Sequence, residues 1–551
     1  MGGEIEVYKI DYLPIVRKYA EKIGIMDAFN RLVPTEMEVE AGDIVLGMIL
    51  DTLSGRSPLY QLEEFFKEQD RELLFGKVIS PEAFNDDHVG RTLDKIYEAG
   101  TQKIFTEISL QAASKFKIEK EYIHQDTTSV TMYGDYNYEG DNVLFKIVRG
   151  HSKNHRPDLK QFVISLICIG RDIPIFGKME DGNSSDKKIN NGILTSISKR
   201  LAEYGIEEKE YIYIADSALV TEDNLKKMGD ETLFISRMPA NYKEHGRIIE
   251  EAVEKDIWEE IGIIAETKGS KRRPNAIYRG YEGGSVELHG KKYRAIVIHS
   301  SAHDRRRQKR IEKEIKKARE ELDIKCKTAC KIEYYSKGDA EKAAEELQKA
   351  GKEYHEITVC VEERPQMQRG RPSKEGVQKI KEMLYGLMTE IKEKKDVLEK
   401  KNKEAGCFVL ISNVPKEGEK GHDAVKILRA YKEQHGIEKN FGFLKDPVIV
   451  NSLFLKKPER IEALGLILLL SLLIWRLMEH SMRRHVENSE KPLAGWDKKD
   501  TKRPTSFMMT TKFSNIMLIR IGNERRLARP LSEIQKGYLV ALDVEDNIFT
   551  K

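Results

Sequence analysis

Three acidic residues occupy positions from which their carboxylates could hold a hard divalent cation. Asp126 lies near the end of a short extended run that begins at Tyr122, and Asp216 ends a second extended run that begins at Glu210. Glu438 lies in a stretch whose residue pattern predicts a helix. Mg²⁺ takes oxygen ligands and is usually held by one or two carboxylates together with substrate phosphate. Two strand ends and one helix therefore predict a magnesium site, provided that the fold brings these acids together.

The predicted helix, Ala430–Pro447, carries other polar side chains in register with Glu438. Tyr431 and Lys445 lie seven residues before and after Glu438, and seven residues are almost two helical turns. The three side chains therefore project from one side of the helix, which Gln434 shares. The helix is expected to end at its proline, because the residue before a proline disfavours helical geometry. This spacing alone also fits an ordinary solvated polar face, and the two upstream aspartates favour chemistry.

The same helix resembles the signature of a known family. DDE transposases of bacterial insertion sequences, in the broad IS-four-type superfamily, carry Tyr, two residues, Arg, three residues, Glu, six residues and Lys. Tyr431, Glu438 and Lys445 fit that spacing, while Gln434 stands where the signature has arginine. Further local matches to the IS-sixteen-thirty-four branch are Asn85–Asp94, Gly150–Gln161 and Pro458–Leu464. The resemblance covers nearly the whole chain.

The strand pattern after Lys117 fits the α/β fold that this resemblance implies. The order is β-β-β-α-β-α-β, which predicts an RNase H-like catalytic core. The predicted strands are Tyr122–Thr131, Val143–Val148, Gln161–Gly170 with Ile173–Lys178 as its extension, Tyr211–Ala215 and Phe234–Arg237. The predicted helices between them are Lys187–Tyr204 and Thr221–Lys227.

A large α+β insertion is expected inside this core, because 221 residues separate Asp216 from Glu438. Its predicted elements are β structure over Glu282–Ser300 and helices over Asp304–Asp323, Ala340–Gly351 and Glu375–Lys400. The expected domains are a helical N-terminal domain (1–116), the first core part (117–239), the insertion (240–405), the second core part (406–485) and a C-terminal extension (486–551). Within the C-terminal extension, helical structure is expected over Arg503–Ile521 and Leu527–Val544. The N-terminal domain either recognises DNA ends or packs against the core.

The resemblance implies a two-metal mechanism. Asp126, Asp216 and Glu438 are then the catalytic residues and the ligands of two Mg²⁺ ions about 3.5–4 Å apart, for which Mn²⁺ can substitute. Water cuts the transposon end and frees a 3′-hydroxyl, which then attacks target DNA. The implied partner is double-stranded DNA, as terminal inverted repeats and as target, bound by a homodimer.

Several basic and polar residues are expected to contact this DNA. Lys445 and Tyr431 would contact phosphate near the cut, and Arg369 and Arg371 lie in an Arg-Gly-Arg-Pro sequence that resembles a minor-groove hook or forms a basic linker. The expected DNA-binding residues are Tyr431, Gln434, Lys445, Lys153, Arg156, Lys160, Arg369 and Arg371.

The amino-acid composition indicates the cellular compartment and limits the kinds of partner to expect. The 551 residues exceed one core, and a net charge of +3 means that any basic surface is local, as in the run Arg305–Lys317. Five cysteines make a disulfide framework improbable and fit a reducing cytoplasm. The N-terminus lacks the pattern of a signal peptide. The apolar run Gly465–Trp475 is shorter than the ~20 residues that span a bilayer, so it and its flanks, Pro458–His480, predict a buried helix rather than a membrane anchor.

The sequence leaves two other functions open. A nuclease would use the same three acids without joining DNA, since cleavage and strand transfer share one site. A non-catalytic DNA-binding remnant of an element is the other alternative, and the presence of all three acids argues against it. Asp135 or Asp223 would replace an upstream ligand if the strand assignment failed.

Overall fold

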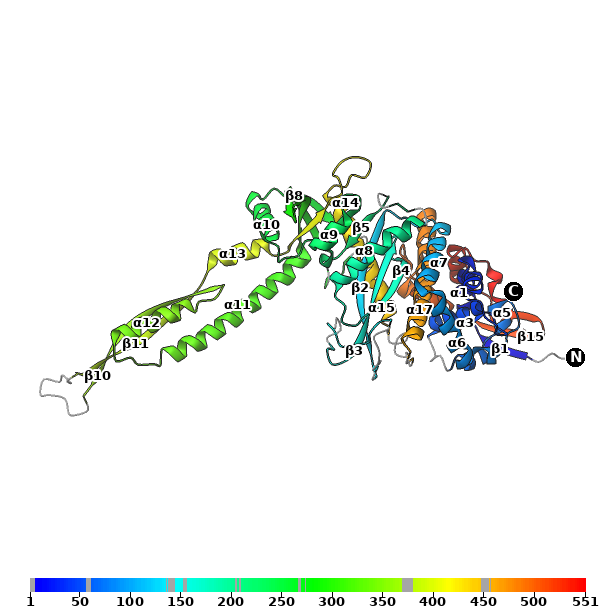
Figure 1. The fold of residues 1–551 in the computed structure, drawn as a ribbon, viewed down its shortest axis with the longest axis horizontal. Helices are drawn as coiled ribbons and strands as arrows, with labels where there is room; N and C mark the ends of the chain where they lie inside the picture. Colours follow the sequence, from blue (N-terminus) through cyan, green and yellow to red (C-terminus); the bar gives the residue numbers. More distant parts are fainter. Residues whose placement is uncertain are drawn as a thin grey trace. The chain divides into compact units, whose positions relative to one another are not determined.

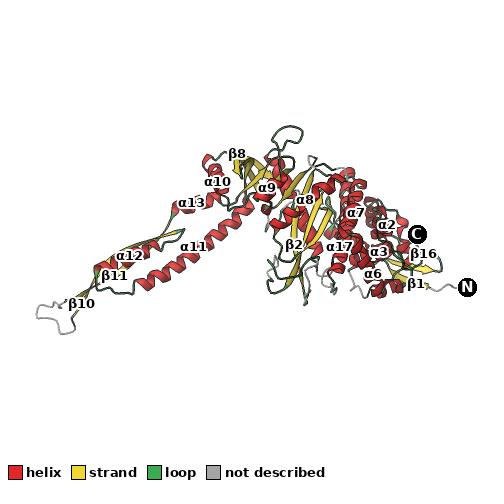
Figure 2. Ribbon diagram, viewed as in Figure 1, coloured by secondary structure: helices red, strands yellow, loops and turns green. Residues whose placement is uncertain are grey.

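The protein is a mixed α/β chain that divides into two compact units. The computed structural model describes residues 5–55, 61–134, 136, 144–151, 156–203, 206–207, 210–265, 269–272, 274–368, 380–446, 455 and 457–551. The first unit comprises Met1–Ser236, Asn413–Pro415 and Ile427–Lys551, and the second comprises Arg237–Ser412 and Lys416–Lys426. The segment expected as an insertion, residues 240–405, falls within the second unit. Figures 1 and 2 show the helices and strands.

A mixed sheet forms the centre of the first unit. Its strand order is β4-β3-β2-β5-β6. Neighbours are antiparallel from β4 to β2 and parallel from β2 to β6. The strands are β2 (Tyr122–Met132), β3 (Lys160–Ile169), β4 (Ile173–Glu180), β5 (Ile212–Ala215) and β6 (Leu233–Arg237). Since β3 is buried along nearly its whole length, its continuous apolar sequence is that of a strand covered on both faces.

Two strand predictions in this sheet are wrong in part. The segment predicted as Val143–Val148 contributes only an isolated bridge from Val148 to Gln161 among its described residues. Lys146 instead bonds to the loop after β4, with its amide donating to Asp181 Oδ1 at 2.6 Å. The run from Ile173 is not an extension of β3 but a separate strand, because the chain reverses at Arg171, whose φ is 77°.

The helices flanking this sheet agree closely with prediction. Helix α8 (Asp186–Glu203) precedes β5, and α9 (Glu222–Met228) begins after Thr221. The Thr221 side chain caps α9 by accepting a hydrogen bond from the Asn224 amide. Both helices therefore begin within one residue of the predicted positions.

Helix α17 (Pro458–Ser489) is the central helix of the first unit and extends nine residues beyond its predicted end. It is the one described helix that is long and apolar enough to cross a membrane, but 94% of its apolar window is buried inside the protein, as in a core helix. It packs on β4 and on the N-terminal helices α1 (Leu13–Lys22), α3 (Ala41–Ser54), α6 (Asp86–Ala99) and α7 (Thr101–Lys115), as Figure 1 shows for α7. The other N-terminal helices are α2 (Ile25–Leu32), α4 (Leu62–Lys67) and α5 (Arg71–Phe75).

The two ends of the chain fold together. Strand β1 (Ile5–Lys9) pairs antiparallel with β15 (Met517–Ile521), which pairs with β16 (Glu524–Leu527). Strand β15 occupies the end of a segment predicted to be helical, Arg503–Ile521, of which only α18 (Ser506–Phe513) is a helix. Pairing with the distant β1 and the β-branched content of β15 explain that error. The second predicted segment contains α19 (Glu533–Ala541).

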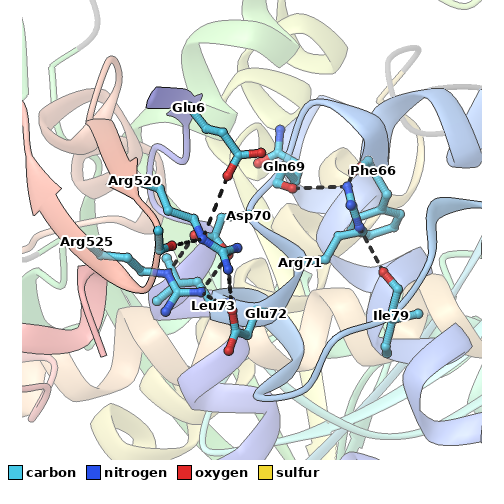
Figure 3. A network of polar contacts seen from close by, with 11 residues as sticks. Glu6, Phe66, Gln69, Asp70, Arg71, Glu72, Leu73, Ile79, Arg520 and Arg525 are labelled. Atoms are coloured by element: carbon cyan, nitrogen blue, oxygen red, sulfur yellow. Dashed lines mark hydrogen bonds and ion pairs between the residues drawn. The ribbon is translucent and has the colours of Figure 1, made fainter. Parts of the chain in front are cut away.

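An ion-pair network joins this small sheet to the N-terminal helices (Figure 3). Asp70, whose side chain is fully buried, accepts from Arg525 Nε at 2.6 Å. Arg525 Nη2 and Arg520 Nη2 each lie 2.8 Å from Glu72 Oε2. Burial alone would raise the pKa of Asp70, but hydrogen bonds from Arg525 and the Leu73 amide, with the charges of both arginines, bring that pKa below its usual value.

We expect Asp70→Asn to destabilise the protein by about 3 kcal/mol at pH 7, because Arg525 loses the negative charge of its buried partner. Since folding lowers the pKa of Asp70, its contribution is fully present above the unfolded value near pH ~4 and is lost as pH falls through the folded value. The variant should therefore lose part of the acid dependence of stability, measured by urea unfolding between about pH 3 and 7. The exposed pair Glu524–Arg526 supplies the control: Glu524→Gln should change stability by less than about 1 kcal/mol. Equal losses in the two variants would contradict this account.

The second unit combines part of a sheet with long helices. Its strands follow the order β12-β9-β8-β7. The hairpin of β8 and β9 confirms the β structure predicted over Glu282–Ser300, and it turns at His289 and Gly290, which both have positive φ. The elements are α10 (Lys243–Lys255), β7 (Glu259–Ile263), β8 (Ile277–Leu288), β9 (Lys291–Ser300), α11 (Ser301–Ala329), α12 (Lys337–Lys349), β10 (His355–Met367), β11 (Ile380–Glu393), α13 (Lys395–Glu404) and β12 (Cys407–Ser412).

The helix predicted over Glu375–Lys400 is wrong. Its described part forms strand β11 and the start of α13, and β11 pairs antiparallel with β10 along its length. Leu384 and Leu387 are buried three residues apart, a spacing that also fits a helix. Leu387 packs in a small core with residues of α11, α12 and β10. This long-range packing outweighs the helix propensity of a Lys- and Glu-rich sequence.

Candidate active site

Strands β2 and β5 bring two of the predicted acids to neighbouring positions. The parallel register pairs His124 with Ile214, and Asp126 and Asp216 each follow two residues later. Adjacent strands lie about 4.8 Å apart, and residues two apart on a strand project to the same side. Continuation of this register therefore places Asp126, which lies within β2, and Asp216, which directly follows β5, at neighbouring positions of the sheet.

Backbone amides orient both carboxylates. Asp126 Oδ1 accepts from the Thr127 amide at 2.7 Å. Asp216 Oδ1 accepts from the Ala218 amide at 2.9 Å and caps a short helical turn. The Ser236 hydroxyl donates to the Asp216 carbonyl at 2.8 Å, which ties this strand end to β6. Both aspartates are partly exposed, so the pair is held in place while solvent reaches it.

A buried histidine precedes Asp126 on β2. His124 is fully buried on β2, two residues before Asp126, and neither ring nitrogen has a hydrogen-bond partner among the described residues. Burial, helped by the positive charge of Arg171, lowers the pKa of His124 to about 4. The imidazole is therefore neutral at pH 7 and adds no charge beside the aspartates.

The predicted helix Ala430–Pro447 is two helices rather than one. Helix α14 (Ala424–Glu433) ends before Gln434, and α15 (His435–Leu444) begins after it. The Gln434 backbone amide donates to the Tyr431 backbone carbonyl at 3.3 Å, and the Ile437 backbone amide donates to the Gln434 backbone carbonyl at 3.1 Å. Both bonds span three residues instead of four, which tightens the backbone at the junction. Tyr431 therefore belongs to α14, and Lys445 caps the end of α15, close to the predicted end.

Helix α15 packs directly on the strands that carry the acids. It contacts β2, β3 and α17. The Gln434 side-chain amide donates to the carbonyl of Gln125, the residue before Asp126, at 3.4 Å. At Gly436 an added Cβ would lie 2.4 Å from the Arg171 carbonyl oxygen, so only glycine permits this approach. The start of α15 is thus fixed against the backbone next to Asp126.

A network of buried polar residues holds α15 against α17. Asn440 is fully buried, donates to the Asp172 carbonyl at 2.9 Å and accepts from Arg476 Nε at 2.7 Å. Arg476 also donates to Glu479 Oε2 at 2.7 Å, and Glu479 pairs with Arg483. Burial lowers the pKa of the Arg476 guanidinium. These residues were missed from sequence, although charged residues directly after the apolar run of α17 were a usable signal.

Glu438 lies on the exposed flank of α15. Its side chain is 63% exposed, and Oε2 lies 2.7 Å from His435 Nδ1. Among the described residues no three His, Cys, Asp or Glu side chains form a group that could hold a metal ion. The strand register therefore gives Asp126 and Asp216 neighbouring positions, and Glu438 lies on the helix packed against their sheet, in contact with His435.

The other predicted DNA contacts are placed unevenly. Arg156 forms a bidentate pair with Asp158 at 2.8 and 2.7 Å, and Lys160 Nζ donates to the Tyr136 carbonyl at 3.1 Å. Both side chains are therefore engaged within the protein. The predicted residues Lys153, Arg369 and Arg371 lie outside the described residues.

The ends of the Gly150–Gln161 motif have structural roles. A Cβ added at Gly150 would lie 2.0 Å from the Gly182 carbonyl oxygen. The Gln161 side-chain amide donates to that same oxygen at 2.7 Å and to the His151 carbonyl at 3.2 Å. The two ends of the motif thus fasten the segment before β3 to the loop after β4.

The comparisons with known proteins say little about activity. A family model described as a domain of unknown function, DUF4277, matches residues 5–110, which run from β1 into α7. No curated protein matches the chain. The matched domain lies outside the strands and the helix that carry the three acids.

Proposed function

We propose that this chain is a DDE transposase that cuts the ends of an insertion sequence and joins them to target DNA. The observation that carries the proposal is the equivalent position of Asp126 and Asp216, two residues beyond the last paired residues of adjacent parallel strands. Antiparallel pairing on one side of β2 and parallel pairing on the other supports an RNase H-like core, as the sequence resemblance implies. The signature spacing of Glu438 adds independent support.

The donor set suits hard divalent cations. Asp126, Asp216 and Glu438 offer carboxylate oxygens only, the ligands that Mg²⁺ prefers and Mn²⁺ also accepts. When bound, the cations supply Lewis-acid stabilisation of charge at the reacting phosphate. Because Glu438 contacts His435, its carboxylate must exchange that hydrogen bond to join the two aspartates.

The protein's own residues then orient DNA at this site. Lys445 and Tyr431 contact phosphates beside the cut, one by charge and the other by its hydroxyl. Gln434 links the start of α15 to β2 through its side-chain hydrogen bond to the Gln125 carbonyl, so its main role is to position the helix. A homodimer in the cytoplasm would hold both ends of the element and the target.

The test is a cleavage and joining assay. The full chain is incubated in Mg²⁺ with a labelled duplex copied from either end of its own element and with an unlabelled target plasmid. A transposase releases a 3′-hydroxyl at the element end and links the label covalently to the plasmid. Cleavage without joining would favour the nuclease, and binding without cleavage would favour the non-catalytic remnant.

A further inference from the structure

The N-terminal half of α11 concentrates positive charge. Residues 301–317 contain eight lysines and arginines against three acids, whereas residues 319–329 contain three of each. Helix α11 runs without a break through both halves (Figure 1). Between Arg305 and Lys317 only Ile311 is buried. This half of the helix is therefore highly charged and buries little apolar surface.

Four of these cations form one exposed stripe, which we call the α11 stripe: Arg305, Lys309, Lys313 and Lys316. Successive members lie four, four and three residues apart, a spacing that keeps them on one face of a helix. All four are exposed and form no ion pair with any described residue, unlike Arg310, which pairs with Glu314 at 2.7 Å. The exposed acid Glu312 lies three residues after Lys309 and four before Lys316, so it shares this face, and the face carries four positive charges against one negative charge.

The stripe is unfavourable for the helix itself. Like charges three or four residues apart repel, so neighbouring members of the α11 stripe destabilise the helix that carries them, and Glu312 offsets this repulsion only for Lys309 and Lys316. A solvated structural helix normally alternates charge signs at these distances, as Arg319 and Asp323 do at 3.1 Å. An anion that lies along the stripe would relieve the repulsion, which indicates a binding surface.

We propose that the α11 stripe binds the phosphate backbone of duplex DNA. The stripe spans about 16 Å, since each helical residue rises about 1.5 Å. A straight row of cations suits a duplex, which is stiff over this length and carries closely spaced phosphates. A membrane surface is a poorer match, because interfacial helices expose large apolar side chains opposite their cations, and α11 exposes none before Ile324. The proposal takes its ligand from the proposed function.

The test compares two full-length quadruple variants. One replaces the stripe with Arg305→Gln, Lys309→Gln, Lys313→Gln and Lys316→Gln. The control removes the same charge from exposed residues of α11 and α12 with Lys325→Gln, Lys327→Gln, Lys342→Gln and Lys349→Gln. Binding of a fluorescent duplex is measured by anisotropy between about 50 and 200 mM salt, and vesicles containing phosphatidylserine are tested in parallel.

The stripe variant should lose salt sensitivity. Each phosphate contact contributes about 0.9 to the slope of log affinity against log salt, so four contacts contribute about 3.6. Over a fourfold change in salt, wild type should lose about 100-fold more affinity than the stripe variant. The control variant should keep the wild-type slope, and the melting temperature of the stripe variant should not fall. Equal slopes in the two variants, or loss of vesicle binding with DNA binding unchanged, would overturn the proposal.

Failure of this proposal and failure of the proposed function give different results. If the chain never cuts DNA but the stripe variant alone loses salt sensitivity, the DNA surface stands and the transposase does not. If the stripe variant binds as wild type does while wild type cuts and joins DNA, the transposase stands and the surface does not.

Discussion

Replacing Asp126 with asparagine is expected to slow cleavage of element-end DNA about 1,000-fold, while DNA affinity stays constant or rises. The substitution keeps the size of the side chain but removes the charge that would hold a cation beside Asp216. A loss of about 4 kcal/mol of transition-state stabilisation, within what a metal ion supplies, corresponds to this factor. Affinity should not fall because one negative charge facing the phosphates has been removed. Single-turnover cleavage and anisotropy on the same duplex measure the two quantities.

Asp223 provides a matched control for this prediction. It is an exposed acid in the first turn of α9, close in sequence to Asp216 and itself a possible ligand if the strand assignment failed. Asp223→Asn should cut at the wild-type rate. A slow Asp223→Asn protein beside an unaffected Asp126→Asn protein would move the site away from Asp126 on β2.

Replacing Arg476 with methionine is expected to destabilise the protein by about 3–5 kcal/mol, the usual cost of removing one partner of a buried ion pair. Arg476 is 6% exposed and bridges Asn440 on α15 to Glu479 on α17. Without the guanidinium, the Asn440 oxygen and the Glu479 carboxylate lose charge-assisted partners inside the core. Urea unfolding of the full chain measures the loss.

The exposed Arg484 of the same helix is the control, since within the described part of the chain its side chain donates only to the Phe116 carbonyl, at 3.1 Å. Arg484→Met should cost about 1 kcal/mol. Because Asn440 holds α15, the folded fraction of the Arg476→Met protein should also cut DNA more slowly than wild type. Normal stability together with normal cleavage in this variant would show that the buried network does not position the helix.

Sequence reasoning predicts best where one local pattern dominates. Strands β3 and β5 have continuous apolar runs, and α9 has a capping threonine, so their types and limits follow from short stretches of sequence. The apolar run of α17 likewise predicts a buried helix. Asp216 could be proposed because it follows such a strand, and Asp126 because it lies in the extended run that became β2.

The errors lie where distant contacts decide the structure. Strand β11 has the composition of a helix and becomes a strand by pairing with β10. The junction at Gln434 depends on the close approach of Gly436 to Arg171, which are far apart in sequence. The support of α15 by Arg476 also joins distant segments, and the sequence signals it only through the charges that follow the apolar run of α17. The pairing of Glu438 with His435 is a local contact three residues apart on one helix, which the sequence prediction overlooked.

Glu438 is the acid whose role the structure supports least directly, so its replacement tests the central claim most sharply. The measurement is single-turnover cleavage of the element-end duplex in Mg²⁺ by wild type and by Glu438→Gln, with DNA affinity determined for both. If Glu438 is the third carboxylate of the site, Glu438→Gln should bind DNA normally. Its cleavage should be at least about 100-fold slower than that of wild type, a loss of about 2.7 kcal/mol of transition-state stabilisation. Wild-type cleavage by Glu438→Gln would contradict the DDE assignment and leave α15 as a structural helix.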